Sequence, residues 1–158
     1  MIESEPNNSI LTATPISLGA AITGQLASST DVDYYKISTT QAGVLSIAFD
    51  APGNSSLNYF NLALYDVNGV LLGQYTTGSD KTYTFGAAAA GTYYVAASAA
   101  TYYDSNQYSL TAGFTAGSAS GYEYESNGTS AKANPLTAGV AITGQLASST
   151  DVDYYKIS

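Results

Sequence analysis

Acidic and amide side chains alternate in two short segments of the chain. Near the N-terminus they are Glu3, Glu5 and Asn7, and further along they are Asp31 and Asp33. In an extended backbone, alternate side chains point to the same side, about 7 Å apart. Carboxylate and amide oxygens suit Ca²⁺, which takes about six to eight oxygens at about 2.3–2.6 Å. Brought together, the two segments predict a calcium site, whereas solvated loop acids are the alternative.

The composition excludes most other chemistry. The 158 residues include no histidine, cysteine, tryptophan or arginine. Without histidine or cysteine there is no Ser-His-Asp or Cys-His nucleophile, no histidine-bound zinc and no disulfide. Two carboxylates can in principle hydrolyse a glycoside, but nothing in the sequence pairs them in a pocket. We therefore expect that the chain is not an enzyme.

The charge of the chain excludes some classes of binding partner. Four lysines against twelve acids give a net charge of −8, and the lack of arginine argues against nucleic acid or an anionic membrane as partner. No apolar run approaches the ~20 residues that span a bilayer, and no signal peptide is recognisable. Only 10% of residues are charged, as in secreted bacterial β-proteins. The expected location is extracellular or on the bacterial cell surface, as an internal fragment without its own signal peptide.

A long internal repeat organises the chain. Residues 21–38 recur letter for letter as residues 141–158, an offset of 120. Over residues 3–20 and 123–140, six of 18 positions match, and three of those six are the alternating Glu, Glu and Asn. The same offset predicts a partial second set of metal ligands: Glu123, Glu125, Asn127, Asp151 and Asp153.

A period of this length exceeds the ~20–50 residues of a solenoid repeat, so each unit is a domain. We expect a complete β-sandwich repeat over residues 1–114, a flexible small-residue linker over 115–122, and the truncated N-terminal part of the next repeat over 123–158. This organisation indicates part of a tandem array. A degenerate C-terminal stub of a complete protein is the alternative.

The hydrophobic pattern is that of strands. Apolar and polar residues alternate with period two in several segments, and Asn68-Gly69 is a strong hairpin signal. The sequence predicts an all-β fold, a jelly-roll-like antiparallel β-sandwich of about eight strands. The expected strands cover residues 22–26, 35–38, 44–49, 61–65, 70–72, 81–85, 92–97 and 107–114.

The order of these motifs resembles the bacterial pre-peptidase C-terminal (PPC) domain family, which includes the collagen-binding domains of clostridial collagenases. The resemblance covers residues 3–114 and 123–158. Its most specific motifs are DVDYYKIS at 31–38 and GTYYV at 91–95, and ESEPNN at 3–8 and LYDVNG at 64–69 add to them.

The resemblance implies a jelly-roll sandwich without catalytic activity. It also implies calcium held where the N-terminal segment meets the loop before Asp33, with the Tyr34 carbonyl as a further ligand and Asp31 as a weaker one. The sequence departs from the family at Asn8, where those relatives have aspartate, and Thr30 offers no carboxylate. Whether one or two ions bind therefore stays open.

Two non-catalytic functions follow. The first is a calcium-stabilised stalk or spacer repeat of a secreted or surface bacterial protein. The alternative is a module that binds a matrix polymer (collagen or another polymer such as a polysaccharide or glycan), attached to a secreted peptidase or adhesin; its binding residues are not identifiable from sequence. Neighbouring repeats are the other expected partners, with strand-swapped self-association if residues 123–158 replace 3–38.

Overall fold

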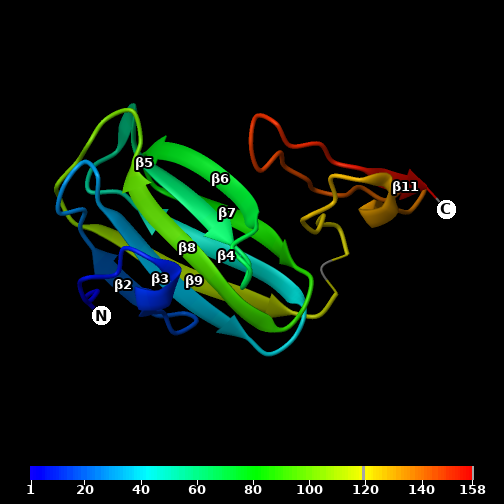
Figure 1. Cartoon of the computed structure of the whole chain (residues 1–158), viewed down its shortest axis with the longest axis horizontal. Coiled ribbons are helices and arrows are strands. Elements are labelled where there is room, and N and C mark those ends of the chain that lie inside the picture. Colours follow the sequence, from blue (N-terminus) through cyan, green and yellow to red (C-terminus); the bar gives the residue numbers. More distant parts are fainter. Residues whose placement is uncertain (119, 158) are drawn as a thin grey trace.

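The computed structural model describes residues 1–118 and 120–157; Ala119, in the expected linker, and Ser158 lie outside the described residues. Two sheets pack face to face (Figure 1). The five-stranded sheet has the order β1 (Thr14–Pro15), β3 (Val32–Thr39), β8 (Gly91–Ala99), β5 (Ser55–Tyr65) and β6 (Leu71–Gly78). The four-stranded sheet has the order β2 (Ala21–Gly24), β9 (Tyr108–Ala116), β4 (Gly43–Asp50) and β7 (Lys81–Ala87).

The connectivity puts distant strands side by side. Among the eight long strands β2 to β9, the first and last (β2 and β9) are neighbours in one sheet, and β3 and β8 are neighbours in the other. This order is that of a double-sheet jelly roll. The all-β sandwich expected from the sequence is confirmed, and each predicted segment overlaps one of the strands β2 to β9, with differences of one or two residues where segments 22–26, 70–72 and 107–114 extend past their strands.

The expectation of a purely antiparallel sandwich is corrected at one strand. The two-residue strand β1 pairs in parallel with β3, Thr14 opposite Tyr35 and Pro15 opposite Lys36. A segment this short shows no period-two pattern, so it could not be predicted. Strand β5 also begins six residues before the predicted segment, because its polar start at Ser55 breaks the hydrophobic pattern.

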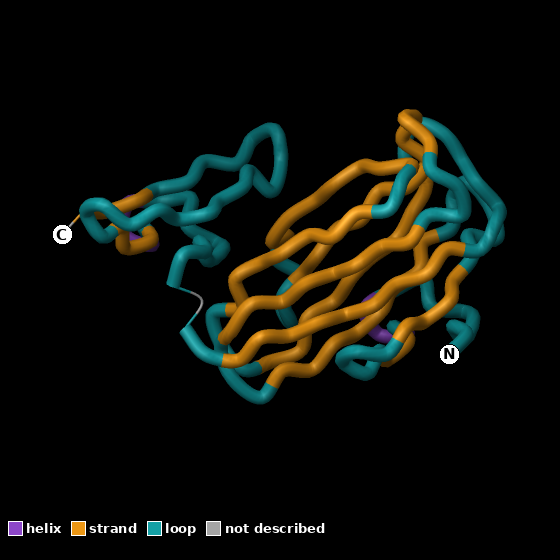
Figure 2. Tube along the Cα trace, turned by 180° about the vertical axis from the view of Figure 1, so that it is seen from behind, coloured by secondary structure: helices purple, strands orange, loops and turns teal. Residues whose placement is uncertain are grey.

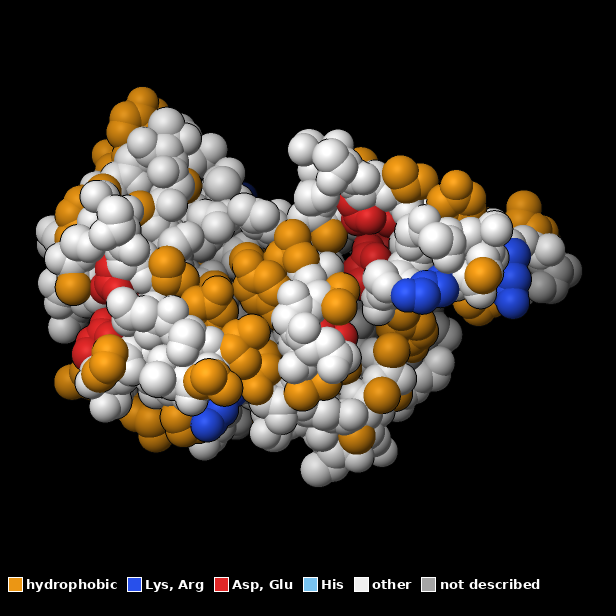
Figure 3. All heavy atoms as spheres, in the orientation of Figure 1, with side chains coloured by type: hydrophobic (Ala, Val, Ile, Leu, Met, Phe, Trp, Pro, Cys, Tyr) orange, Lys and Arg blue, Asp and Glu red, His pale blue; other side chains and the backbone are white. Residues whose placement is uncertain are grey.

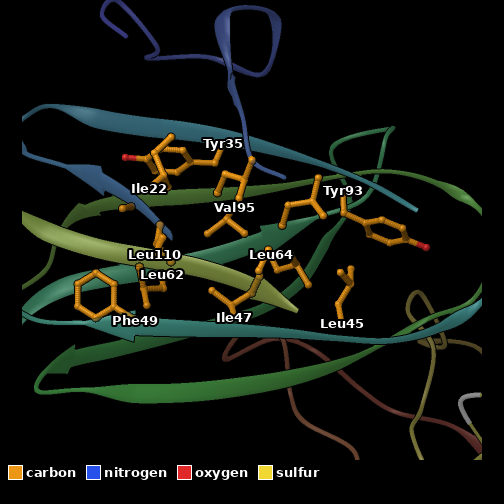
Figure 4. Packing of buried hydrophobic residues seen from close by; sticks show 14 of the residues in the cluster. Ile22, Tyr35, Leu45, Ile47, Phe49, Leu62, Leu64, Tyr93, Val95 and Leu110 are labelled. Carbon is orange, nitrogen blue, oxygen red and sulfur yellow. The ribbon is translucent and has the colours of Figure 1, made fainter. Parts of the chain in front are cut away.

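Period-two burial builds the core between the sheets (Figure 4). Along β4 the side chains of Leu45, Ile47 and Phe49 are buried, with less buried residues between them. An aromatic contact joins Phe49 to Phe60, with ring centroids 5.0 Å apart. The Tyr108 ring packs 5.4 Å from Phe49 and 5.5 Å from Phe60, so the core reaches one side of the acidic cluster described below.

The predicted hairpin turn depends on a glycine. Gly69 has φ 77°, and the Asp66 carboxylate accepts the N–H groups of Asn68 at 2.9 Å and Val70 at 2.8 Å. Left-handed backbone costs an L side chain about 1–2 kcal/mol. We expect Gly69→Ala to lower the free energy of unfolding by about 1 kcal/mol in urea titrations. Gly91→Ala is the matched control, because no atom lies within 4 Å of the added Cβ. Equal losses of stability in both variants would contradict a requirement for glycine in the left-handed backbone at position 69.

The second copy repeats the local structure of the first at the same offset. The 3-10 turn η1 (Ile10–Thr12) recurs as η2 (Ser130–Lys132). Strand β10 (Asn134–Leu136) pairs in parallel with β11 (Tyr155–Ile157), as β1 pairs with β3. Figure 2 shows this copy beside the sandwich. Within the described residues, no helix is long and apolar enough to cross a membrane.

Candidate metal centre

The N-terminal arm (residues 1–7) lies along strand β2. Ile2 and Thr23 form a parallel bridge, and the Glu3 N–H donates to the Thr23 carbonyl at 3.0 Å. One carboxylate oxygen of Glu3 accepts the N–H of Gln25 at 2.6 Å. The backbone at the end of β2 thus fixes both the main chain and the carboxylate of Glu3.

Glu3, Glu5 and Asp33 meet in one cluster. One carboxylate oxygen of each lies within 4.8 Å of the others. The arm supplies the two glutamates and β3 supplies Asp33. Asp33 is fully buried, Glu3 is half-buried and Glu5 is exposed. The cluster therefore joins two segments that are distant in sequence and opens to solvent at Glu5.

Asn7 clamps the arm to β3. Its side chain is fully buried, and its backbone carbonyl accepts the N–H of Tyr34 at 2.9 Å. Its own N–H donates to Glu5 Oε2 at 2.9 Å, and its Nδ2 donates to Glu3 Oε2 at 3.2 Å. The amide orientation is set by this last bond, which leaves Oδ1 free of the glutamates.

Two buried oxygens of the cluster have no donor. Asn7 Oδ1 and Asp33 Oδ1 are buried and accept no hydrogen bond from the described residues. A buried polar atom without a partner costs about 1–3 kcal/mol. A hard cation would satisfy both oxygens together with the carboxylates of Glu3 and Glu5.

Two tyrosines connect the carboxylates from the core side. The Tyr35 hydroxyl donates to Glu3 Oε2 and lies 2.8 Å from the Tyr108 hydroxyl, which lies 2.5 Å from Asp33 Oδ2. Gly24 makes room for this pair, since a Cβ there would overlap the Tyr35 hydroxyl and lie 2.7 Å from the Tyr108 ring. One oxygen of Glu3 and one of Asp33 are therefore held by the core.

The cluster favours a neutral Asp33 when no cation is bound. Burial raises the pKa of Asp33 to about 8; the Tyr108 hydrogen bond opposes the rise, and the negative charges of Glu3 and Asp31 add to it. Burial also raises the pKa of Glu3. With a pKa of about 8, the metal-free Asp33 carboxyl holds a proton at pH 7, while its Oδ2 accepts the Tyr108 hydroxyl. A bound cation would displace that proton.

The second copy builds the same cluster from Glu123, Glu125 and Asp153, again with one oxygen of each within 4.8 Å. Asn127 Nδ2 donates to Glu123 Oε2 at 3.2 Å, and Tyr155 donates to the same oxygen. Burial raises the pKa of Glu125 to about 7 and that of Asp153 to about 6. Glu125 Oε1, Asn127 Oδ1 and Asp153 Oδ1 are buried and accept no hydrogen bond from the part of the chain that the structure describes.

The remaining predicted ligands lie elsewhere or meet the arm differently. Asp31 turns back onto its own loop, where Oδ2 accepts the Ala27 N–H at 2.7 Å and Oδ1 accepts the Val32 N–H at 2.9 Å. Asp151 does the same in the second copy. Neither belongs to the carboxylate clusters. Tyr34 meets the arm through its backbone N–H.

Sequence reasoning missed Tyr35, Tyr108 and Gly24. Tyr35 follows the predicted ligand Asp33 at an inward-facing position of β3, so the period-two pattern could have indicated it. Tyr108 is 75 residues from Asp33, and no local signal connects the two.

No protein-family model and no curated protein matches the sequence. Among solved structures, the chain is similar to the pre-peptidase C-terminal domain of a collagenase from Bacillus anthracis, with 21% identity and a TM-score of 0.49, over 63% of this chain and 93% of that one. It is also similar to Aeromonas hydrophila PliG, a periplasmic inhibitor of g-type lysozyme, with 15% identity and a TM-score of 0.47, over 65% of this chain and 96% of that one.

Proposed function

We propose that the chain is a non-catalytic, calcium-stabilised β-sandwich repeat with the start of the next, and that it acts as a stalk or spacer module of a secreted or surface bacterial protein. One observation carries the proposal: both copies gather the same three acids and leave the same asparagine and aspartate oxygens buried without a donor. The copies match at only six of 18 positions over 3–20 and 123–140, so this local geometry has outlasted considerable divergence.

Calcium in this centre would fasten the arm to the sandwich. The ligands would be the carboxylates of Glu3, Glu5 and Asp33 with Asn7 Oδ1, and bound calcium would neutralise their mutual repulsion. Only hard oxygen donors are present, which favours Ca²⁺ over softer metals. Extracellular calcium modules bind with Kd of about 10⁻⁴–10⁻³ M, which suits a module outside the cell, where calcium at such levels keeps the folded form bound.

A thermal melt tests the calcium site. A ligand at 100 times its Kd stabilises the folded state by about 2.7 kcal/mol, and about 1 kcal/mol shifts Tm by about 2–8 °C. We expect Ca²⁺ to raise the Tm of the chain by several degrees and the double variant Glu3→Ala with Asp33→Ala to abolish the rise. Asp50→Ala, an exposed acid outside the clusters, is the control and should keep it. A wild-type Tm that does not change on adding Ca²⁺ would contradict the calcium site.

A second candidate, binding of a matrix polymer or glycan, is favoured by one surface feature. On the outer face of the five-stranded sheet, Tyr94 pairs with Lys36 on one side and Tyr65 on the other. The Tyr34 ring lies 6.3 Å from that of Tyr65. Tyrosine rings offer an apolar face with a polar tip for such a ligand. Pull-down against collagen and a glycan panel, repeated with Tyr65→Ala and Tyr94→Ala, tests this; no capture by the calcium-loaded wild type leaves the spacer function alone.

A further inference from the structure

We infer that the β6–β7 edge of one sandwich is the docking surface for the N-terminal arm of the following repeat, so that consecutive repeats join head to tail. The edge is formed by Leu72 and Gly73 of β6 and residues 84–86 of β7, and the second arm by residues 121–127 with 143–145 of the adjoining segment. The inference rests on the tandem repeat of the proposed function and not on its calcium site.

The two surfaces lie on opposite sides of the sandwich. Strands β6 and β7 are the last strands of the two sheets, and β1 and β2 are the first. The first arm runs along β2. A repeat therefore has its arm at one side and the edge that receives the next arm at the other. Contacts between two different surfaces, repeated without closure, generate open linear chains.

The second arm already contacts this edge. Gln145 Nε2 donates to the backbone carbonyl of Leu72 at 3.0 Å. Beside this contact, a cavity of about 190 Å³ lies between the edge and the second arm. Tyr75, Tyr83 and Phe85 line it on the sandwich side and Tyr122 on the arm side. Covering an edge in this way also protects its unpaired backbone groups from other strands.

Glycines at the edge leave room for the arm. A Cβ on Gly86 would lie 2.5 Å from the carbonyl oxygen of Glu123 and 3.2 Å from both Cβ of Tyr122 and the Tyr124 ring. All three nearest atoms belong to the second arm and none to the sandwich. A Cβ on Gly73 would overlap the Gln145 amide. The missing side chain of Gly86 therefore leaves room for the second arm.

The two copies differ at the arm in the way that docking requires. Ile2 is 73% exposed, whereas its counterpart Tyr122 is half-buried against the first sandwich. Gln25 is exposed and its amide donates to Ser105 of its own repeat at 2.7 Å, whereas Gln145 is half-buried against Leu72. At these positions the second arm is the more buried one, although none of the described residues after it forms a strand like β9. The preceding sandwich provides that cover.

Docking places the second acidic cluster at the joint. Glu123 and Glu125 line the same cavity as Phe85 and Gly86, and Figure 3 shows acidic side chains gathered on the side of the second copy that faces the sandwich. Each following repeat would therefore carry its acidic cluster against the repeat before it.

Backbone NMR of the full chain in metal-free buffer tests the inference. In the wild type, the amides of residues 121–126 and 143–145 should show heteronuclear NOE values equal to those of the sandwich strands. Gly86→Ala should lower them while the Tm of the sandwich stays unchanged, because the three atoms nearest the added methyl all belong to the arm. Gly91→Ala, whose Cβ meets nothing within 4 Å, should change neither.

Gln145→Ala and Gln25→Ala form a second matched pair at equivalent repeat positions. The first should loosen the second arm and the second should not. Low NOE values in the wild-type arm, or an arm unaffected by Gly86→Ala, would overturn the inference, as would NOE values that fall on dilution, because the contact would then join separate chains. Because no calcium is present, failure here is distinct from failure of the calcium-dependent melt.

Discussion

The Asp33→Asn substitution is expected to stabilise the metal-free protein at pH 8 and to remove the stabilisation by calcium bound with Glu3 and Glu5. The asparagine side chain keeps the size of the aspartate and an oxygen that can accept the Tyr108 hydroxyl, which lies 2.5 Å from Asp33 Oδ2. It brings no charge into a site where Asp33 is fully buried beside Glu3 and Glu5. The same substitution removes the carboxylate on which the cation would depend.

The pH dependence has a definite sign. The pKa of Asp33 is raised by burial from 3.8 to about 8 in the folded protein. Between these values the folded state holds a proton that the unfolded state has lost, so stability falls as pH rises from about 4 to about 8 and is constant above. One pKa unit corresponds to about 1.4 kcal/mol, so the loss is on the order of a few kcal/mol. The Asp33→Asn variant has no titrating group at this position and should escape the loss.

Urea unfolding in EDTA at pH 4.5 and pH 8 measures this effect. The stability of Asp33→Asn should match that of the wild type at the lower pH and exceed it at the higher pH. With calcium the order at pH 8 should reverse, because only the wild type binds the ion at the cluster of Glu3, Glu5 and Asp33. Asp50→Asn is the control and should follow the wild type throughout. A variant that loses stability in parallel with the wild type from pH 4.5 to 8 would contradict a neutral, buried Asp33.

Phe60→Ala is expected to cause the largest loss of stability in the core. Phe60 is 1% exposed and packs against Phe49 and Tyr108 at centroid distances of 5.0 and 5.5 Å. Truncating a buried phenylalanine costs about 3–5 kcal/mol, a large part of the about 5–15 kcal/mol that stabilises a typical domain. Calorimetric melting should show a Tm lower by roughly 10 °C or more.

Leu57→Ala on the same strand provides the comparison. Leu57 is 43% exposed, so its truncation should change stability by about 0.5 kcal/mol or less. Similar losses at positions 57 and 60 would show that the core is not packed around Phe60 as described.

The sandwich could be predicted from sequence because its strands are amphipathic. Leu45, Ile47 and Phe49 alternate with less buried residues on β4, and the Asn68-Gly69 turn marks the hairpin between β5 and β6. Strand β1 escaped prediction because two residues cannot show a period. Its parallel pairing with β3 joins Thr14 to Tyr35, too far along the chain for the local sequence to indicate it.

The candidate site was predictable only where its residues are close in sequence. The alternating Glu3, Glu5 and Asn7 indicated the arm, but spacing alone could not separate Asp33 from Asp31. The loop before β3 decides between them, because it turns the Asp31 carboxylate back to the N–H groups of Ala27 and Val32. The docking edge carried no sequence signal either, since Gly86 resembles an ordinary strand glycine until the second arm is placed beside it.

The most direct test of the calcium centre is a calorimetric titration of the metal-free chain with Ca²⁺ at pH 8, alongside Asp33→Asn with Asp153→Asn. The wild type should show saturable binding with Kd of about 10⁻⁴–10⁻³ M, with protons released when the titration is repeated at pH 7, because Asp33 must ionise. The double variant, which lacks the aspartate carboxylate of each cluster, should show none. Absence of saturable binding in the wild type, or equal binding in the double variant, would contradict a calcium centre built on these carboxylates.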